Sequence, residues 1–330
     1  MKNKFNVSAS PHMKGKDTTA TIMRDVMIAL TPAALFGVYQ FGLRALVILV
    51  LSITSCVLSE YLYKKWMKLP SDGYECSAMV TGLLLGMNLS VNVPYWIPVL
   101  GGVFAIVVVK MLFGGLGQNF MNPALAARCF LLISAGRPMT DFAVEKAEAG
   151  RLSQLLVSGA SGIDGLSSAT PLAAIKAGES VSLFDMFFGY TGGTIGETSA
   201  FLLLIGGIYM IVCNIISIRI PAAYLASFVV FMGLFGEHGF DPEYLAMQLC
   251  GGGLMLGAFF MATDYVTSPI TPKGKIVFGI FLGILTGIFR VYGGSAEGVS
   301  YAIITGNILV PLIEKVTMPK SFGKGGKANV

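Results

Sequence analysis

The sequence has few charged residues for its length. Lys, Arg, Asp and Glu together make up 12% of the 330 residues, whereas a soluble domain carries about 25%. A soluble protein of this size needs a polar surface, so the composition excludes a soluble globular domain. Hydrophobic residues make up 54% of the chain and glycine contributes 41 residues, as is typical of helices that pack closely in lipid. The composition therefore predicts a membrane protein.

The sequence also lacks the patterns of a metal site, a nucleic-acid-binding protein or a cleaved secretory leader. The five cysteines form no CxxC pair, and we interpret them as buried thiols that pack as small hydrophobes. The formal charge is +5, but the lysines lie in short loops and at the termini, where they orient spans and meet anionic lipid. No nucleic-acid partner is expected. The first twenty residues contain no apolar run of the kind that a signal peptide needs.

Ten segments are apolar enough to be membrane spans, with about 20 residues taken as a full crossing. They cover residues 26–42, 43–63, 76–90, 95–113, 121–135, 199–218, 220–236, 245–262, 276–291 and 299–314. We therefore predict an all-α polytopic membrane protein with about ten transmembrane helices. Several of the segments are shorter than a full span.

The lysines and arginines predict the orientation of these spans. With the N-terminus in the cytoplasm, most of them fall on the cytoplasmic side, among them Lys64, Lys65 and Lys68, as the positive-inside rule requires. Acidic residues show the opposite bias. An even number of spans returns the C-terminus to the cytoplasm, which favours ten.

The two halves of the apolar body resemble each other. In each half, a short segment with two glycines four positions apart precedes proline, a long span, a Gly-Gly pair and another short segment. Five spans per half would make the repeats inverted, as in many transporter folds, with a site near the membrane centre. Chance is the alternative explanation, because glycine and proline are frequent in membrane helices.

A long polar loop interrupts the apolar body near its middle. It has roughly sixty residues, too many for a simple connection, and the charge bias places it outside the cytoplasm. We therefore divide the chain into five parts. These are a cytoplasmic N-terminal segment (1–25), a first membrane repeat (26–136), the extracytoplasmic loop (137–198), a second membrane repeat (199–315) and a cytoplasmic tail (316–330).

The loop contains the start and stop signals of a short helix. Thr170 suits the N-cap, Pro171 the first helical position and Gly178 the stop. A hydroxyl at this place lies among free backbone N–H groups, which favour an anion such as a phosphate ester. The same residues also describe an ordinary capped surface helix.

The residues around this cap resemble a flavinylation motif, in which an Asp is followed by Ser, Thr or Gly residues and then by Ala-Thr. Here the motif consists of Asp164, Ser167, Ser168, Ala169 and Thr170. The resemblance implies that a flavin transferase esterifies FMN to Thr170 through a phosphodiester, on the extracytoplasmic side.

Three further stretches are similar to the RnfD/NqrB family, whose members are membrane proteins of the Rnf complex and of the sodium-pumping NADH:quinone oxidoreductase. They are residues 10–12, 114–124 and 262–275, and the likeness extends over about residues 8–315. The resemblance implies a prokaryotic cytoplasmic-membrane protein with a second, non-covalent flavin, riboflavin, nearer the cytoplasm. It also implies a complex that moves electrons between ferredoxin and NAD and exports Na⁺ or H⁺. Other membrane, iron–sulfur and flavin subunits would then complete the active sites.

Four polar residues in these stretches are candidate site residues. Asn119 and Asn122 flank a Gly-rich turn, and their amides suit the edge of an isoalloxazine ring, although helix capping is the alternative. We place Asp264 at the edge of a span, as the only carboxylate in or beside one, which makes it a functional candidate. The Thr267 hydroxyl nearby can satisfy backbone groups freed by prolines. The alternative for Asp264 is an N-cap.

Other polar and glycine positions have structural interpretations. Arg128 lies in an apolar segment and needs an anionic or carbonyl partner, whereas we expect Lys110 to snorkel. Glycines recur at four-residue spacing at Gly82 and Gly86, at Gly253 and Gly257, and at Gly279, Gly283 and Gly287, and this spacing predicts helix contacts. Two other functions remain open, a channel or small-solute transporter on the same repeat and a structural scaffold. A transporter needs no long flavin-acceptor loop, and a scaffold would leave Thr170 unmodified.

Overall fold

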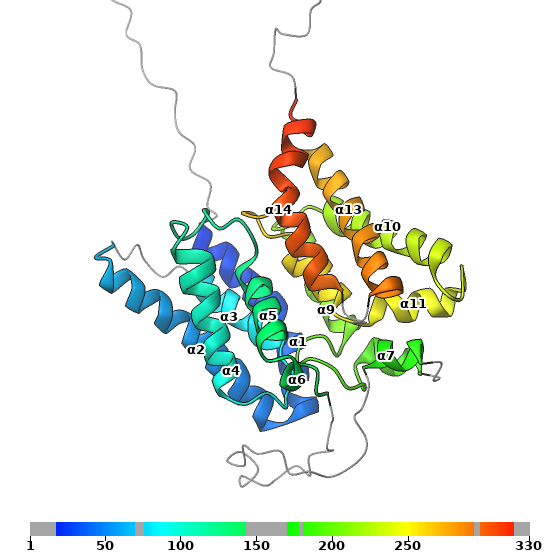
Figure 1. Cartoon of the computed structure of the whole chain (residues 1–330), viewed down its shortest axis with the longest axis horizontal. Coiled ribbons are helices and arrows are strands. Elements are labelled where there is room, and N and C mark those ends of the chain that lie inside the picture. Colours follow the sequence, from blue (N-terminus) through cyan, green and yellow to red (C-terminus); the bar gives the residue numbers. More distant parts are fainter. Residues whose placement is uncertain (1–17, 70–75, 143–169, 178–180, 294–297, 320–330) are drawn as a thin grey trace, which may run out of the picture.

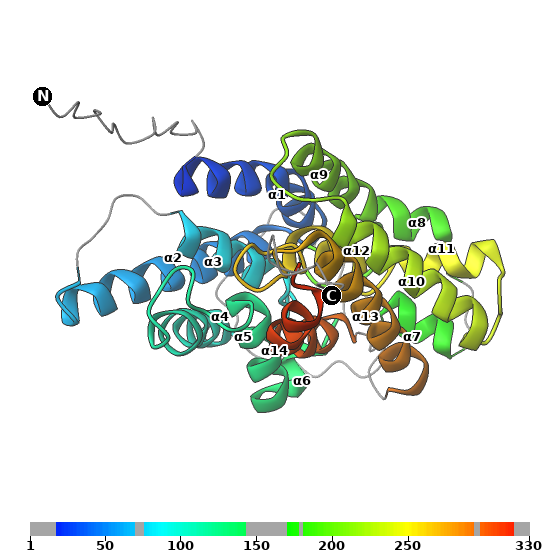
Figure 2. The same cartoon turned by 90° about the horizontal axis from the view of Figure 1, so that it is seen from above.

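The computed structural model describes residues 18–69, 76–142, 170–177, 181–293 and 298–319. Within these ranges all regular structure is helical, which confirms the all-α prediction. Helices α2 to α6 lie on one side of the molecule and α10 to α13 on the other (Figures 1 and 2). Helices α5 and α14 contact each other where the two sides meet, and α1 packs against α9.

The first half of the chain contains two long helices, α1 and α2, and several shorter helical segments. They are α1 (Thr19–Phe41), α2 (Leu43–Trp66), α3 (Ser77–Met87), α4 (Trp96–Val103), the π-helix η1 (Phe104–Met111), α5 (Pro123–Ser134) and α6 (Gly136–Met139). Helix α4 runs directly into η1, so the two form one continuous rod.

The rest of the described chain begins with two short helices that fall within the predicted loop. These are α7 (Pro171–Lys176) and α8 (Leu183–Phe188). The second apolar half then follows with α9 (Ala200–Val212), α10 (Arg219–Phe235), α11 (Pro242–Cys250), α12 (Leu254–Leu256), the π-helix η3 (Gly257–Met261), α13 (Pro272–Tyr292) and α14 (Val299–Thr317).

Four of these helices are long and apolar enough to cross a membrane, namely α1, α2, α13 and α14. Helix α11 and the α12–η3 rod form a pair that meets the same test together but bends by 66° at the break. Shorter apolar helices are α3, α4–η1, α5, α9 and α10. A helix or a bent pair therefore occupies each apolar segment that the sequence predicts, and four or five of them meet the length of a full span.

Proline and a capping side chain begin several of the helices. Asn122, Asp241 and Thr271 each cap a helix whose first residue is proline, and each side-chain oxygen accepts a hydrogen bond from a backbone N–H in the first turn. Proline is well suited to this first position because it has no N–H to satisfy. The start of each of these helices is therefore set by its capping residue and proline.

Close helix packing depends on glycine at two interfaces. A Cβ at Gly82 of α3 would lie 2.6 Å from Ile53 Cα of α2, and one at Gly283 of α13 would lie 2.6 Å from the Tyr224 carbonyl oxygen of α10. These distances leave no room for a side chain, so the prediction that the glycines mark helix contacts is confirmed there. Gly253 differs, since it has φ +67° and faces the side chain of Glu197.

Candidate functional site

Thr170 is the N-cap of α7, as the sequence predicts. Its Oγ1 accepts a hydrogen bond from Ala173 N at 3.4 Å, and Pro171 is the first helical residue. The helix ends at Lys176 with Ala177 as its C-cap. The predicted stop Gly178, His12 and the other motif residues, Asp164, Ser167, Ser168 and Ala169, lie outside the described residues.

A small cavity of about 20 Å³ adjoins Thr170. Four segments line it, the start of α7, helix α8, the chain between α8 and α9, and the break between α11 and α12. The lining residues are Thr170, Pro171, Met186, Thr191, Gly192, Gly193, Glu197, Thr198, Cys250, Gly251 and Gly252. Four of them are glycines: Gly193 has open space beside its backbone, whereas the Leu172 side chain packs against Gly251 and Gly252.

The last part of the predicted loop is buried in the helical body. Ile195 N donates to the Leu89 carbonyl at 3.0 Å and Gly196 N to the Met87 carbonyl at 2.8 Å. Thr194 and Thr198 are 1% and 4% exposed. These contacts fasten the segment between α8 and α9 to the end of α3, so the residues after the Thr170 helix return into the apolar body.

A buried ion pair joins this segment to the first half. Arg128 Nη1 of α5 lies 2.7 Å from Glu197 Oε1, and both side chains are about 5% exposed. The same nitrogen donates to Asn88 Oδ1 at 2.6 Å. The predicted need of Arg128 for an anionic partner is thus confirmed, and Glu197 both supplies that partner and lines the Thr170 cavity.

A second polar cluster lies where the broken segments of the two halves meet. Asn122 caps α5 with its Oδ1, while its Nδ2 donates to the Met261 carbonyl at 3.4 Å. With its amide oriented to satisfy its neighbours, Asn307 of α14 donates to the Thr267 carbonyl and accepts from Asn122 N, both at 3.1 Å. The structure therefore brings together Asn122 and Thr267, from the two stretches that the sequence singles out.

The other two candidates of this cluster make mostly local contacts. Asn119 is 7% exposed, and its Nδ2 donates to the Met121 carbonyl at 3.1 Å. Asp264 accepts from the Thr267 hydroxyl at 3.1 Å and from Val266 N at 3.5 Å. Asp264 therefore stabilises its own turn, between η3 and α13, rather than capping α13, whose N-cap is Thr271.

A series of contacts connects the two clusters. Glu197 at the Thr170 cavity pairs with Arg128, and Arg128 donates to Asn88. Asn88 Nδ2 lies 3.9 Å from Met261 Sδ, and the Met261 carbonyl accepts from Asn122. The two candidate sites thus lie at opposite ends of one row of buried polar groups.

Comparison with known proteins gives a match to the family described as NQR2, RnfD, RnfE over residues 6–323. The chain belongs to this family. The match covers nearly the whole sequence and confirms the resemblance that the motifs indicated.

Several curated proteins, each the D subunit of an ion-translocating complex, are similar to this family member over almost its full length. The protein from the Na⁺-translocating ferredoxin:NAD⁺ oxidoreductase complex of Acetobacterium woodii is 47% identical, with 97% of this chain and 95% of the relative covered. The protein from the proton-translocating complex of Clostridium ljungdahlii is 39% identical, with 98% and 97% covered. The protein from the ion-translocating oxidoreductase complex of Aliivibrio salmonicida is 35% identical, with 97% and 98% covered.

Two expectations about charged residues in this NQR2, RnfD, RnfE family member are wrong. Lys110 does not snorkel: it is 3% exposed, and its Nζ lies 2.8 Å from Glu60 Oε2. Asp264 is not the only carboxylate in or beside a span, because Glu60 within α2 and Glu197 are both buried. The sequence does contain one signal for this pair, a glutamate and a lysine that each lie within an apolar segment. Because the residues around both are apolar, nothing local indicates that they contact each other.

Proposed function

We propose that this chain is the membrane subunit of an Rnf-type ferredoxin:NAD⁺ oxidoreductase. It carries electrons through the membrane on FMN bound covalently to Thr170 and on a non-covalent riboflavin, coupled to translocation of Na⁺ or H⁺. Family membership and the names of the similar proteins support the complex and its reaction. The single observation that carries the flavin site is that the Thr170 hydroxyl, preceded by the flavinylation motif, adjoins a glycine-lined cavity.

The chemical groups around Thr170 are of kinds that suit an attached FMN. A Cβ at Gly193 would meet nothing within 4 Å, so a flat ring system can approach the backbone of this lining residue closely. Thr191, Glu197 and Thr198 offer hydroxyl and carboxylate groups at the same wall, and polar groups of this kind orient a bound ligand. Arg128 holds Glu197 in place. When bound, FMN supplies one- and two-electron transfer.

The junction of the two halves is where we place riboflavin, nearer the cytoplasm. Asn122 already caps α5 and bonds Met261, so it would shape the site. Asn119, at the exit of the Gly-rich turn, is the residue that we assign to the ring edge, with Thr267 and Asp264 on the facing turn. The row of polar groups from Glu197 to Asn122 connects this junction to the Thr170 cavity.

The fold supports the proposed topology of ten spans in two inverted repeats. A short helix and a broken pair occur at corresponding places, with α3 in the first half and α11–α12–η3 in the second. The last helix of each half, α5 and α14, contacts the other. In this topology both termini are cytoplasmic and the Thr170 loop is extracytoplasmic. The remaining membrane, iron–sulfur and flavin subunits are the partners, and a flavin transferase matures the chain.

Flavin fluorescence in a denaturing gel tests the covalent site. We expect an ultraviolet-excited fluorescent band for the wild-type chain produced together with the transferase, and a dark band for Thr170→Ala. Thr305→Ala is the matched control, since Thr305 is exposed on α14 and donates to the Tyr301 carbonyl of its own helix; it should remain fluorescent. A dark wild-type band would contradict the proposal, and a fluorescent Thr170→Ala band would move the flavin to another residue.

A further inference from the structure

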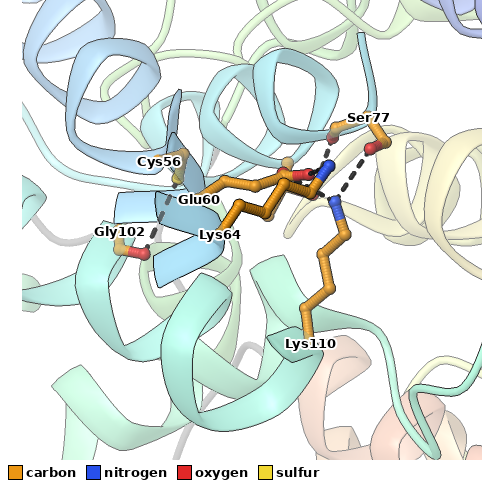
Figure 3. Close-up of polar contacts among 7 residues, drawn as sticks. Cys56, Glu60, Lys64, Ser77, Gly102 and Lys110 are labelled. Carbon is orange, nitrogen blue, oxygen red and sulfur yellow. Dashed lines mark hydrogen bonds and ion pairs between the residues drawn. The ribbon is translucent and has the colours of Figure 1, made fainter. Parts of the chain in front are cut away.

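One buried lysine fastens the end of η1 to two other helices (Figure 3). Lys110 Nζ donates to Glu60 Oε2 of α2 and to Ser77 Oγ at the start of α3, both at 2.8 Å. Glu60 also pairs with Lys64, one turn further along α2, at 2.9 Å. Lys110 is 3% exposed, whereas Lys64 is 22% exposed at its side chain. The two lysines therefore share one carboxylate, and the Lys110–Glu60 pair joins η1 to α2.

The backbone of the same lysine holds the turn that follows. The Lys110 carbonyl accepts from Gly115 N at 3.0 Å, and the Met111 carbonyl accepts from Gly114 N at 3.1 Å. Gly114, Gly115 and Gly117 have φ values of +115°, +93° and +90°. Glycine adopts these angles readily but gains no rigidity from a side chain. The Gly-rich turn, residues 112–122, thus depends on its attachment at Lys110.

The position of the Lys110 side chain depends on the π-helical hydrogen-bond spacing of η1. Leu112 N donates to the Val107 carbonyl, five residues back, at 3.0 Å. Such spacing is rare and usually limited to one turn, because the α-helical spacing is more stable. A change of η1 to α-helical spacing would rotate Lys110 away from Glu60 and Ser77 and shift the turn. The buried contacts of Lys110 therefore oppose that change.

We propose that Lys110 is a positioning residue, whose contacts with Glu60 and Ser77 hold η1 in its π-helical register and so fix the Gly-rich turn that carries Asn119 and Asn122. The inference deepens the proposed function and rests on it in one respect, namely that this turn contacts riboflavin. The positioning itself is a property of the protein alone. Two separate measurements can therefore test the positioning by Lys110 and the binding of riboflavin independently.

Hydrogen exchange of the assembled complex in detergent directly tests whether Lys110 fixes the Gly-rich turn. We expect Lys110→Met to raise the exchange rates of amides in residues 112–122 about tenfold, because local opening of the turn becomes easier. Lys64→Met is the matched control, since it removes the other lysine from Glu60 and leaves the turn attached; its rates in these residues should equal those of wild type. Ser77→Ala keeps the ion pair but removes one contact of Lys110 and should give a smaller increase.

Acid extraction of flavin gives the second readout. We expect Lys110→Met to lose most of its extractable riboflavin while the covalent flavin at Thr170 remains, and Lys64→Met to keep both. If the wild-type complex releases no riboflavin, the second flavin of the proposed function is wrong. The exchange rates still test whether Lys110 fixes the Gly-rich turn.

The inference is overturned if residues 112–122 exchange at the same rate in Lys110→Met as in Lys64→Met. It is also overturned if exchange rises equally throughout the chain, because that would show general loss of stability. If the Lys110→Met complex does not assemble, Ser77→Ala provides the test. The inference is then overturned if residues 112–122 exchange at the same rate in Ser77→Ala as in wild type.

Discussion

Charged side chains are buried in the helical body only where a partner from another element meets them, among the residues that the structure describes. Lys110 meets Glu60, Arg128 meets Glu197, and Arg290 donates to the Gln248 and Gly251 carbonyls. An unpaired charge in an apolar medium is costly, because water no longer solvates it. Each pair therefore links two helices or a helix and a loop, and removing one member leaves the other uncompensated.

The Arg128–Glu197 pair gives a prediction at this scale. Arg128→Met should destabilise the chain by about 3–5 kcal/mol, since it leaves Glu197 buried without its cation. Arg128→Met combined with Glu197→Met should be less destabilising than the single change, because no charge remains buried. Thermal unfolding of the purified complex, followed by light scattering, measures both. A double variant as unstable as the single variant would show that the contact with Asn88, not the ion pair, carries the stability.

At the scale of elements, the helices fall into two types. Helices α2, α13 and α14 are long and packed along much of their length, whereas α3, α5 and the bent α11–α12–η3 segment are short and end at turns in the interior. Those turns carry Asn88, Asn122 and Thr267, so backbone groups that a continuous helix would satisfy are left for side chains to bond. Broken helices thus create the polar interior in an otherwise apolar body.

Close packing of α10 on α13 gives a prediction at the element scale. Gly283→Ala would place a Cβ 2.6 Å from the Tyr224 carbonyl oxygen, so the two helices must separate. Overpacking of this kind costs about 1–3 kcal/mol, and we expect the midpoint of thermal unfolding to fall. Gly136→Ala is the matched control, because a Cβ there meets nothing within 4 Å. An equal effect of both changes would mean that the backbone of α10 relaxes and that packing does not limit this interface.

For the whole molecule, the arrangement of the two halves decides which groups lie together. The Thr170 cavity draws its walls from α7, from the chain between α8 and α9 and from the α11–α12 break. The Gly-rich turn lies at the other end of the row of polar groups that starts at Glu197.

Labelling of single cysteines with a membrane-impermeant maleimide tests the proposed orientation. In a background without the natural cysteines, we expect Tyr190→Cys, which is 58% exposed after α8, to be labelled in intact cells. Trp66→Cys, which is 78% exposed at the end of α2, should be labelled only after the membrane is opened. The reverse pattern would invert the topology and place Thr170 in the cytoplasm.

The sequence alone determined the membrane class, the positions of the apolar helices and the cap at Thr170, because each depends on composition or on residues within one turn. Its motifs also indicated the family. Tertiary structure decided the partners of the buried charges, since Lys110 and Glu60 are 50 positions apart and Arg128 and Glu197 are 69 apart. A local pattern of apolar residues shows that a charge lies in an apolar segment, but not whether it is buried or which distant helix supplies its counter-charge. That depends on how the helices pack against one another, and the glycines at their contacts set how closely.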